Sequence, residues 1–129
     1  MRKRLLFVAT GVVAAAALLS ASLAVAGTTL HLTAKDNHKS FTVAAHTAIV
    51  ITLKSNASTG YRWKRGHCSA VKFISRKYVE PASGRVGAAG KEIWRFKVVG
   101  QTTEGKIALR YVGPSKDVAH RFSVQLQIG

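Results

Sequence analysis

One stretch sets the pattern for this chain: Ile49-Val50-Ile51-Thr52-Leu53-Lys54-Ser55-Asn56-Ala57-Ser58-Thr59-Gly60-Tyr61-Arg62-Trp63. Its first five residues are apolar or β-branched, and Tyr61 and Trp63 stand two residues apart, so both flanks are predicted to be strands. Between the flanks, Asn and Ser side chains can hydrogen-bond the local backbone, and Gly60 permits a positive φ. The stretch therefore predicts two strands joined by an ordered loop.

The same two-residue alternation recurs along the rest of the chain. It is seen at Leu30, Leu32 and Ala34; Phe41 and Val43; Trp94, Phe96 and Val98; Ile107, Leu109 and Tyr111; and Phe122, Val124, Leu126 and Ile128. Weaker strand signals lie at residues 71–73 and 78–79, and no segment after Gly27 keeps a helical period. We therefore expect an all-β, immunoglobulin-like β-sandwich of seven or eight strands, with Trp63 and Trp94 in its core.

The N-terminal segment is typical of a secretory signal peptide. Residues 1–4 include three cations, residues 5–19 are almost all apolar, and Ala24-Val25-Ala26 offers a small-residue cleavage pattern. A membrane-spanning segment is disfavoured because the apolar run is rich in Ala and no cationic flank follows it. The prediction is a signal peptide at residues 1–26 and one domain at residues 27–129, which is expected to be a monomer in the periplasm or secreted.

Charge and cysteine content bound the function further. The chain has 20 Lys and Arg against 5 Asp and Glu. Without the cations of residues 1–4, 17 basic and 5 acidic residues remain, a net charge of +12. Polyanions are admissible partners, yet the cations are scattered as on a solvated surface, so specific nucleic-acid binding is not expected. Cys68 is the single cysteine; it cannot form an internal disulfide and is expected to be a half-buried strand residue.

Catalytic chemistry has little support. The five histidines lack metal-ligand spacing, and Asp36 and Asp117 fall in predicted turns, where Asp is common for backbone reasons. Nothing resembles a nucleophile elbow. We therefore expect no enzyme activity, no catalytic residues, no metal and no cofactor.

Three stretches resemble the chagasin-type inhibitors of papain-like cysteine peptidases. Residues 56–63 are similar to the family's Asn-Pro-Thr-Thr-Gly-Tyr/Phe-x-Trp loop. Residues 86–90, followed by Trp94 and Phe96, are similar to its Gly-rich second loop and the strand after it. Residues 105–111 are similar to its Gly-x-Ala-x-Leu-x-Tyr strand, which leads to a third loop.

The resemblance implies a reversible inhibitor that plugs the active-site cleft of a papain-like cysteine peptidase with three loops from one end of a β-sandwich. It places Thr59 and Gly60 nearest the catalytic dyad of the peptidase. The residues implied to contact the peptidase are Asn56, Ser58, Thr59, Gly60, Tyr61, Gly87, Ala88, Gly90, Gly113 and Pro114.

The third loop departs from the family pattern. The family usually has Arg-Pro-Trp there, and this chain has Gly113-Pro114-Ser115. Arg and Trp often dominate interface energies, so weaker inhibition or a different target peptidase is expected. This departure and the +12 charge sustain a second hypothesis, a non-inhibitory basic module that binds an anionic envelope component or a partner protein.

Overall fold

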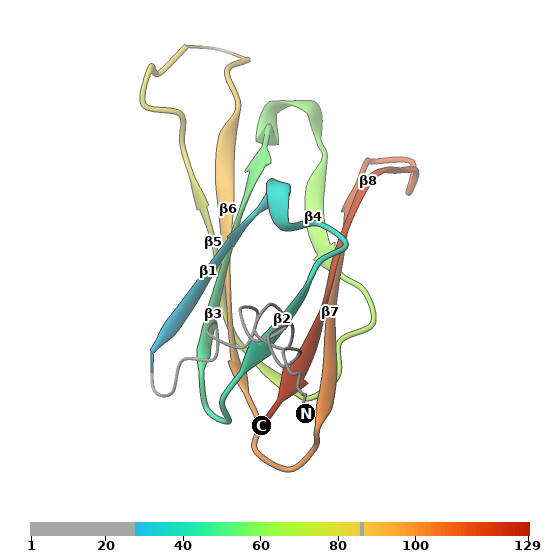
Figure 1. Ribbon diagram of the computed structural model, residues 1–129. Helices are drawn as coiled ribbons and strands as arrows, with labels where there is room; N and C mark the ends of the chain where they lie inside the picture. The colour runs from blue at the N-terminus through green and yellow to red at the C-terminus, as the bar shows by residue number, and fades with distance from the viewer. Residues whose placement is uncertain (1–27, 86) are drawn as a thin grey trace, which may run out of the picture.

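The computed structural model describes residues 28–85 and 87–129, which form eight strands and two short 3₁₀ helices (Figure 1). The strands are β1 (Thr29–Thr33), β2 (Ser40–Val43), β3 (Ala48–Ser55), β4 (Arg62–Arg65), β5 (Val71–Val79), β6 (Gly90–Val98), β7 (Glu104–Val112) and β8 (Val118–Ile128). The 3₁₀ helices are η2 (Ala34–Asp36) and η3 (Ala57–Thr59). The all-β prediction and the strand number are confirmed. The signal-peptide prediction lies outside the described residues.

The strands form two four-stranded sheets that pack face to face. The first sheet has the order β1-β3-β6-β5 and the second sheet the order β2-β8-β7-β4. The pairs β1–β3 and β2–β8 are parallel, and the other neighbours are antiparallel. The hairpins β5–β6 and β7–β8 each stay within one sheet, whereas the connection from β3 to β4 passes from the first sheet to the second.

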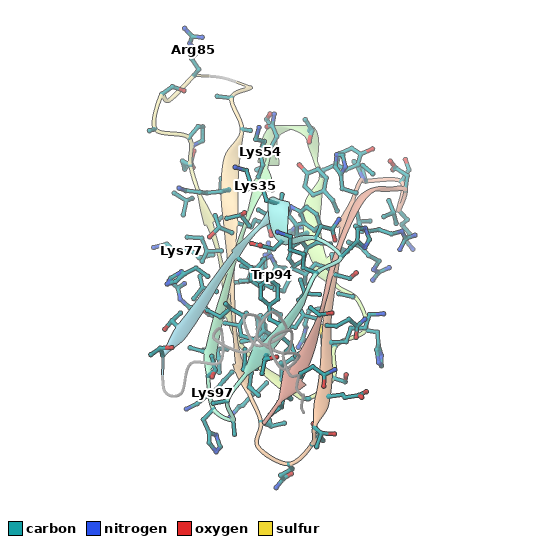
Figure 2. All side chains as sticks on the ribbon, viewed as in Figure 1. Lys35, Lys54, Lys77, Arg85, Trp94 and Lys97 are labelled. Carbon is teal, nitrogen blue, oxygen red and sulfur yellow. The ribbon has the colours of Figure 1, made fainter. Side chains whose placement is uncertain are left out.

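The core is built from alternate residues of both sheets. Ile49 and Ile51 of β3 are fully buried, and Phe122, Val124, Leu126 and Ile128 of β8 are buried opposite them. Trp63 and Trp94 have exposures of 6% and 3%, so the prediction that both are core residues is confirmed. Figure 2 places Trp94 between the two sheets. The alternation in the sequence thus marks the inner face of each sheet.

Three local predictions need correction. The weak signals at residues 71–73 and 78–79 belong to one strand, β5, and its register shifts between Phe73 and Ser75 because Ile74 forms a bulge opposite β6. Cys68 is half-buried as expected, but it lies in the connection between β4 and β5 and not in a strand. Ala34 is exposed and begins η2, so it is not an inward position of the first strand, which ends at Thr33.

A buried carboxylate joins the two sheets at one end. Glu92 of β6 is 1% exposed. Its Oε2 accepts hydrogen bonds from Ser55 Oγ at 2.8 Å and from the Trp63 backbone N–H at 3.0 Å. Its Oε1 accepts hydrogen bonds from Arg76 Nε at 3.1 Å and Trp94 Nε1 at 3.2 Å. Because Ser55 ends β3 and Trp63 lies in β4, the carboxylate holds both ends of the connection between the sheets.

None of the helical segments in the described part of the chain is long and apolar enough to span a membrane.

Candidate functional site

Three connections meet at one end of the sandwich, opposite the β6–β7 turn and the C-terminus (Figure 1). We name them the Asn56 loop (residues 56–61, between β3 and β4), the Gly87 loop (residues 80–85 and 87–89, between β5 and β6) and the Pro114 loop (residues 113–117, between β7 and β8). The Asn56 loop crosses between the sheets, so it lies between the two hairpins. Together the three connections form a composite edge, which we call the three-loop rim.

The Asn56 loop is held in shape by its own polar groups. Asn56 Oδ1 accepts hydrogen bonds from the Ser58 backbone N–H at 3.2 Å and from Ser58 Oγ at 2.7 Å. Thr59 Oγ1 donates to the Asn56 carbonyl at 2.7 Å and accepts from the Tyr61 N–H at 3.3 Å. Gly60 ends η3 with φ of 82°, a conformation that favours glycine. The loop is therefore ordered before any partner arrives.

The Asn56 loop also contacts both neighbouring loops. Asn56 Nδ2 donates to the Gly87 carbonyl at 2.9 Å. On the other side, a Cβ at Gly60 would lie 2.8 Å from Pro114 Cγ, so the glycine backbone packs against the proline ring. These contacts make the rim a single surface and not three independent loops.

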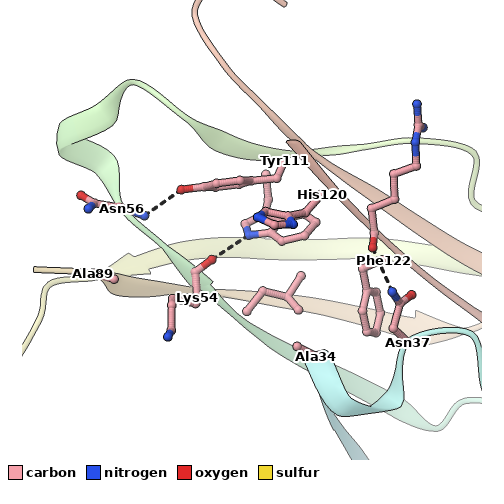
Figure 3. A pocket seen from close by; sticks show the side chains of 11 residues that line it. Ala34, Asn37, Lys54, Asn56, Ala89, Tyr111, His120 and Phe122 are labelled. Atoms are coloured by element: carbon pink, nitrogen blue, oxygen red, sulfur yellow. Dashed lines mark hydrogen bonds between the residues drawn. The ribbon is translucent and has the colours of Figure 1, made fainter. Parts of the chain in front are cut away.

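Aromatic rings support the rim from beneath. Tyr111 OH accepts a hydrogen bond from the Asn56 backbone N–H at 2.9 Å, and its ring packs against Tyr61 and Trp63 with centroid distances of 5.3 and 5.1 Å. Figure 3 shows Tyr111 and His120 along one wall of a recess of about 550 Å³ that extends from Asn56 toward β8. The rim thus rests on aromatic packing that continues into the core.

Tyr61 joins the Asn56 loop to the Pro114 loop through its hydroxyl. Tyr61 OH donates a hydrogen bond to Asp117 Oδ2, and this bond raises the pKa of Tyr61 above its ordinary value of 10.0, with smaller contributions from burial and from the negative charge of Asp117. Gly113 lies beneath the ring, because a Cβ there would lie 2.6 Å from the ring of Tyr61. Only glycine leaves room for this arrangement.

All ten residues that the resemblance implies lie in or beside the rim, with different exposure. Ser58, Thr59, Gly60, Gly87 and Pro114 are exposed, and Asn56, Tyr61 and Ala88 are partly exposed. Gly90 and Gly113 are buried.

The two buried glycines serve packing inside the chain. A Cβ at Gly90 would lie 2.2 Å from the Val79 carbonyl oxygen and 2.7 Å from Tyr78 OH. Their contribution to the rim is therefore to its shape, whereas the exposed members supply its surface.

Three residues that hold the rim are not recognisable from the loop motifs: Glu92, Tyr111 and Asp117. The turn around Asp117 accounts for that residue by backbone preference alone, and the alternation around Tyr111 indicates only a strand. Glu92 does have a signal in the sequence, since a lone Glu at an inward position of an alternating strand requires buried donors.

The residues that the structure describes offer no candidate metal site. Within residues 28–85 and 87–129, no three His, Cys, Asp or Glu side chains are grouped so that they could hold a metal ion. The tip of the Asn56 loop, residues 56–60, has no ionisable side chain. The arrangement is that of a recognition surface made of backbone, hydroxyl and amide groups.

Several known proteins are similar to this chain in sequence or in fold. Residues 42–128 match the family described as chagasin family peptidase inhibitor I42. Amoebiasin-1 of Entamoeba histolytica is 33% identical over 90 residues, which cover 66% of this chain and 83% of that protein. The cysteine protease inhibitor EhICP2 from Entamoeba histolytica superposes with a TM-score of 0.67 at 23% identity, covering 79% of this chain and 96% of that one. The solution structure of Amebosin gives a TM-score of 0.63 at 28% identity, covering 79% and 97%.

The Tyr61–Asp117 contact predicts a pH titration. A tyrosine whose pKa is raised by folding keeps its hydrogen bond at neutral pH and loses it only when the pH passes the raised pKa. Asp117→Asn should therefore lower the pKa of Tyr61 toward its ordinary value, measured by NMR titration of the tyrosine ring signals. Asp36→Asn, in η2, is the control and should leave the Tyr61 titration unchanged. Equal titration in both variants would show that the contact does not form in solution.

Proposed function

The chain belongs to the chagasin family of peptidase inhibitors, and we propose that it is a reversible inhibitor of papain-like cysteine peptidases whose three-loop rim occupies the active-site cleft. Membership of an inhibitor family confirms the expectation that the chain is not itself an enzyme. The observation that carries the proposal is the joining of three loops into one ordered surface, with the uncharged Asn56 loop at its centre.

A preformed rim suits tight docking. Ordering a loop on binding costs conformational entropy, and the Asn56 loop is already fixed by hydrogen bonds within itself, to Gly87 and to Tyr111. Thr59 and Gly60 are exposed at its tip, where we place them nearest the catalytic dyad of the peptidase. Ser58, Gly87, Ala88 and Pro114 would contact the walls of the cleft on either side.

The backbone of the tip explains why such an inhibitor would not be cleaved. Cleavage requires a peptide carbonyl presented to the catalytic thiolate in reactive geometry. In the tip, the Asn56 carbonyl accepts from the Thr59 N–H at 3.2 Å and the Ala57 carbonyl accepts from the Gly60 N–H at 3.1 Å. With the Asn56 and Ala57 carbonyls engaged in this 3₁₀ turn, that part of the tip fills a cleft without offering those two carbonyls to the thiolate.

The Pro114 loop sets a limit on affinity. Pro114 is exposed and supports Gly60, but the neighbouring positions carry Gly113 and Ser115 and offer no large side chain to the peptidase. We propose that the Asn56 and Gly87 loops supply most of the binding energy, because aromatic and Arg residues are the usual interface hot spots and this loop has neither.

The central prediction concerns the tip. Thr59→Asp places an unpaired carboxylate where the peptidase would bury it, so inhibition of papain should weaken by about thirtyfold or more, equivalent to about 2 kcal/mol. Residual papain activity is measured while inhibitor is titrated. The matched control is Thr103→Asp, an exposed threonine before β7 at the opposite end of the sandwich, which should inhibit like the wild type.

Two results would contradict this proposal in different ways. Wild-type protein that leaves several papain-like peptidases fully active at micromolar concentration would remove the inhibitory function. Equal inhibition by the Thr59→Asp variant and the wild type would keep that function but move the contact away from the tip.

We also propose that the chain is exported, with residues 1–26 removed as a signal peptide and residues 27–129 forming the inhibitor in the periplasm or outside the cell. Support comes from the cations, apolar run and small-residue pattern of the N-terminal segment. Mass spectrometry of the protein recovered after export from bacterial cells should give a chain that begins at Gly27. An intact N-terminus on the exported protein would refute the assignment.

A further inference from the structure

The Lys and Arg residues on the outer face of the first sheet are not balanced by any acid there. Along each strand, buried positions alternate with exposed ones, and the strand pairing puts the exposed positions on one outer face. Six cations lie on that face: Lys54 in β3, Lys72 and Lys77 in β5, and Lys91, Arg95 and Lys97 in β6. Figure 2 labels Lys54, Lys77 and Lys97 along this side of the sandwich. Among the described residues, no acid occupies an outward position of the four strands; Glu92 points inward, and Glu80 lies in the loop after β5.

The arrangement of these cations opposes stability. Lys54 lies directly across from Lys91, and Lys72 lies directly across from Lys97. Like charges at directly opposite positions of neighbouring strands repel each other, whereas opposite charges there would stabilise the sheet. A face that keeps two such pairs and lacks acids is suited to an anionic partner that neutralises them.

The same face carries an exposed apolar residue among the cations. Ile74, at the bulge of β5, is 50% exposed and is the only large hydrophobic side chain that exposed in the described residues. It borders a shallow recess of about 470 Å³ whose lining includes Val50, Arg95 and Lys97. The face therefore combines a broad distribution of positive charge with a small apolar centre.

From this combination we propose that the outer face of the first sheet docks peripherally on an anionic lipid membrane. Lys and Arg are attracted to acidic headgroups, and an apolar side chain between them can enter the boundary between headgroups and acyl chains. The six cations spread over three strands, which matches an extended surface better than a single phosphate site. This docking is distinct from peptidase inhibition and does not depend on it.

The face is a poor match for nucleic acid. Its outward positions hold Thr, Ala, Val, Ile, Ser, His, Lys and Arg, without a Phe, Tyr or Trp on which single-stranded bases could stack. A broad sheet face also does not enter the grooves of a duplex as a helix or a two-stranded ribbon does.

The position of the face leaves the rim accessible. The rim lies at one end of the strands (Figure 1), whereas the outer face of the first sheet lies along their length. A protein docked by this flank would hold its strands roughly parallel to the membrane, with the rim directed along the membrane surface. The outer face of the second sheet also has opposed cations, since Arg110 lies directly across from both Lys64 and Arg121, but unlike the first sheet it includes an acid, Glu104, and the neutral Ser123, Gln125 and Gln127.

Vesicle binding tests the proposal. Exported protein, its N-terminus defined by mass spectrometry, is centrifuged with vesicles of equal parts phosphatidylglycerol and phosphatidylcholine in about 0.1 M salt. Lys72→Gln, Arg95→Gln and Lys97→Gln together should weaken binding by about 100-fold, since each cation near an acidic bilayer contributes a factor of about five. The control removes the same charge from the second sheet, with Lys64→Gln, Lys106→Gln and Arg121→Gln, and should weaken binding by less than about fivefold.

A second readout locates the contact. Tryptophan emission of an Ile74→Trp variant should shift to shorter wavelength when anionic vesicles are added, and it should not shift with phosphatidylcholine alone. Equal loss of binding in the two charge variants, or no vesicle binding by the wild type, would overturn the proposal. So would binding of duplex DNA as tight as vesicle binding and equally sensitive to the first-sheet variant, because the face would then recognise polyanions in general.

Discussion

The buried carboxylate of Glu92 is the constraint on which the rim depends. It accepts four hydrogen bonds from residues of β3, β4, β5 and β6, so it satisfies donors that would otherwise be buried without partners. A buried charge is tolerated only when it is paired and fully hydrogen-bonded, and here Arg76 supplies the opposite charge. Because two of the four donors, Ser55 and Trp63, flank the Asn56 loop, the same interaction fixes how that loop leaves one sheet and enters the other.

The position of this connection between the two sheets determines which loops form the rim. The Asn56 loop passes between two hairpins, one from each sheet, and contacts Gly87 on one side and Pro114 on the other. The two surfaces differ in charge. The tip of the Asn56 loop is uncharged, whereas the outer face of the first sheet is strongly basic. The three-loop rim and the outer face of the first sheet lie on different sides of the sandwich, so they can bind different partners independently.

Periodicity in the sequence predicted the inner faces of the sheets, because burial on one face forces alternation at residues such as Trp94, Phe96 and Val98. The loop motif predicted which segments form the rim. Strand pairing was not predictable: the parallel placement of β1 beside β3 depends on contacts distant in sequence. The bulge at Ile74 interrupts the alternation within β5, so this one strand gives two separate signals in the sequence. The bonds from Asn56 to Gly87 and from Tyr61 to Asp117 join loops that local patterns treat separately.

Amide hydrogen exchange of Glu92→Gln tests most directly whether this carboxylate holds the rim in shape. An amide has one acceptor oxygen, so two of the four donors lose their partner, at about 1 to 3 kcal/mol each. Faster exchange is expected at Asn56, Ser58 and Trp63, with no change at Val98 and Ile128 at the opposite end of the sandwich. Unchanged exchange at the first three amides, or equal acceleration at both ends, would show that the Glu92 carboxylate does not hold the rim in shape.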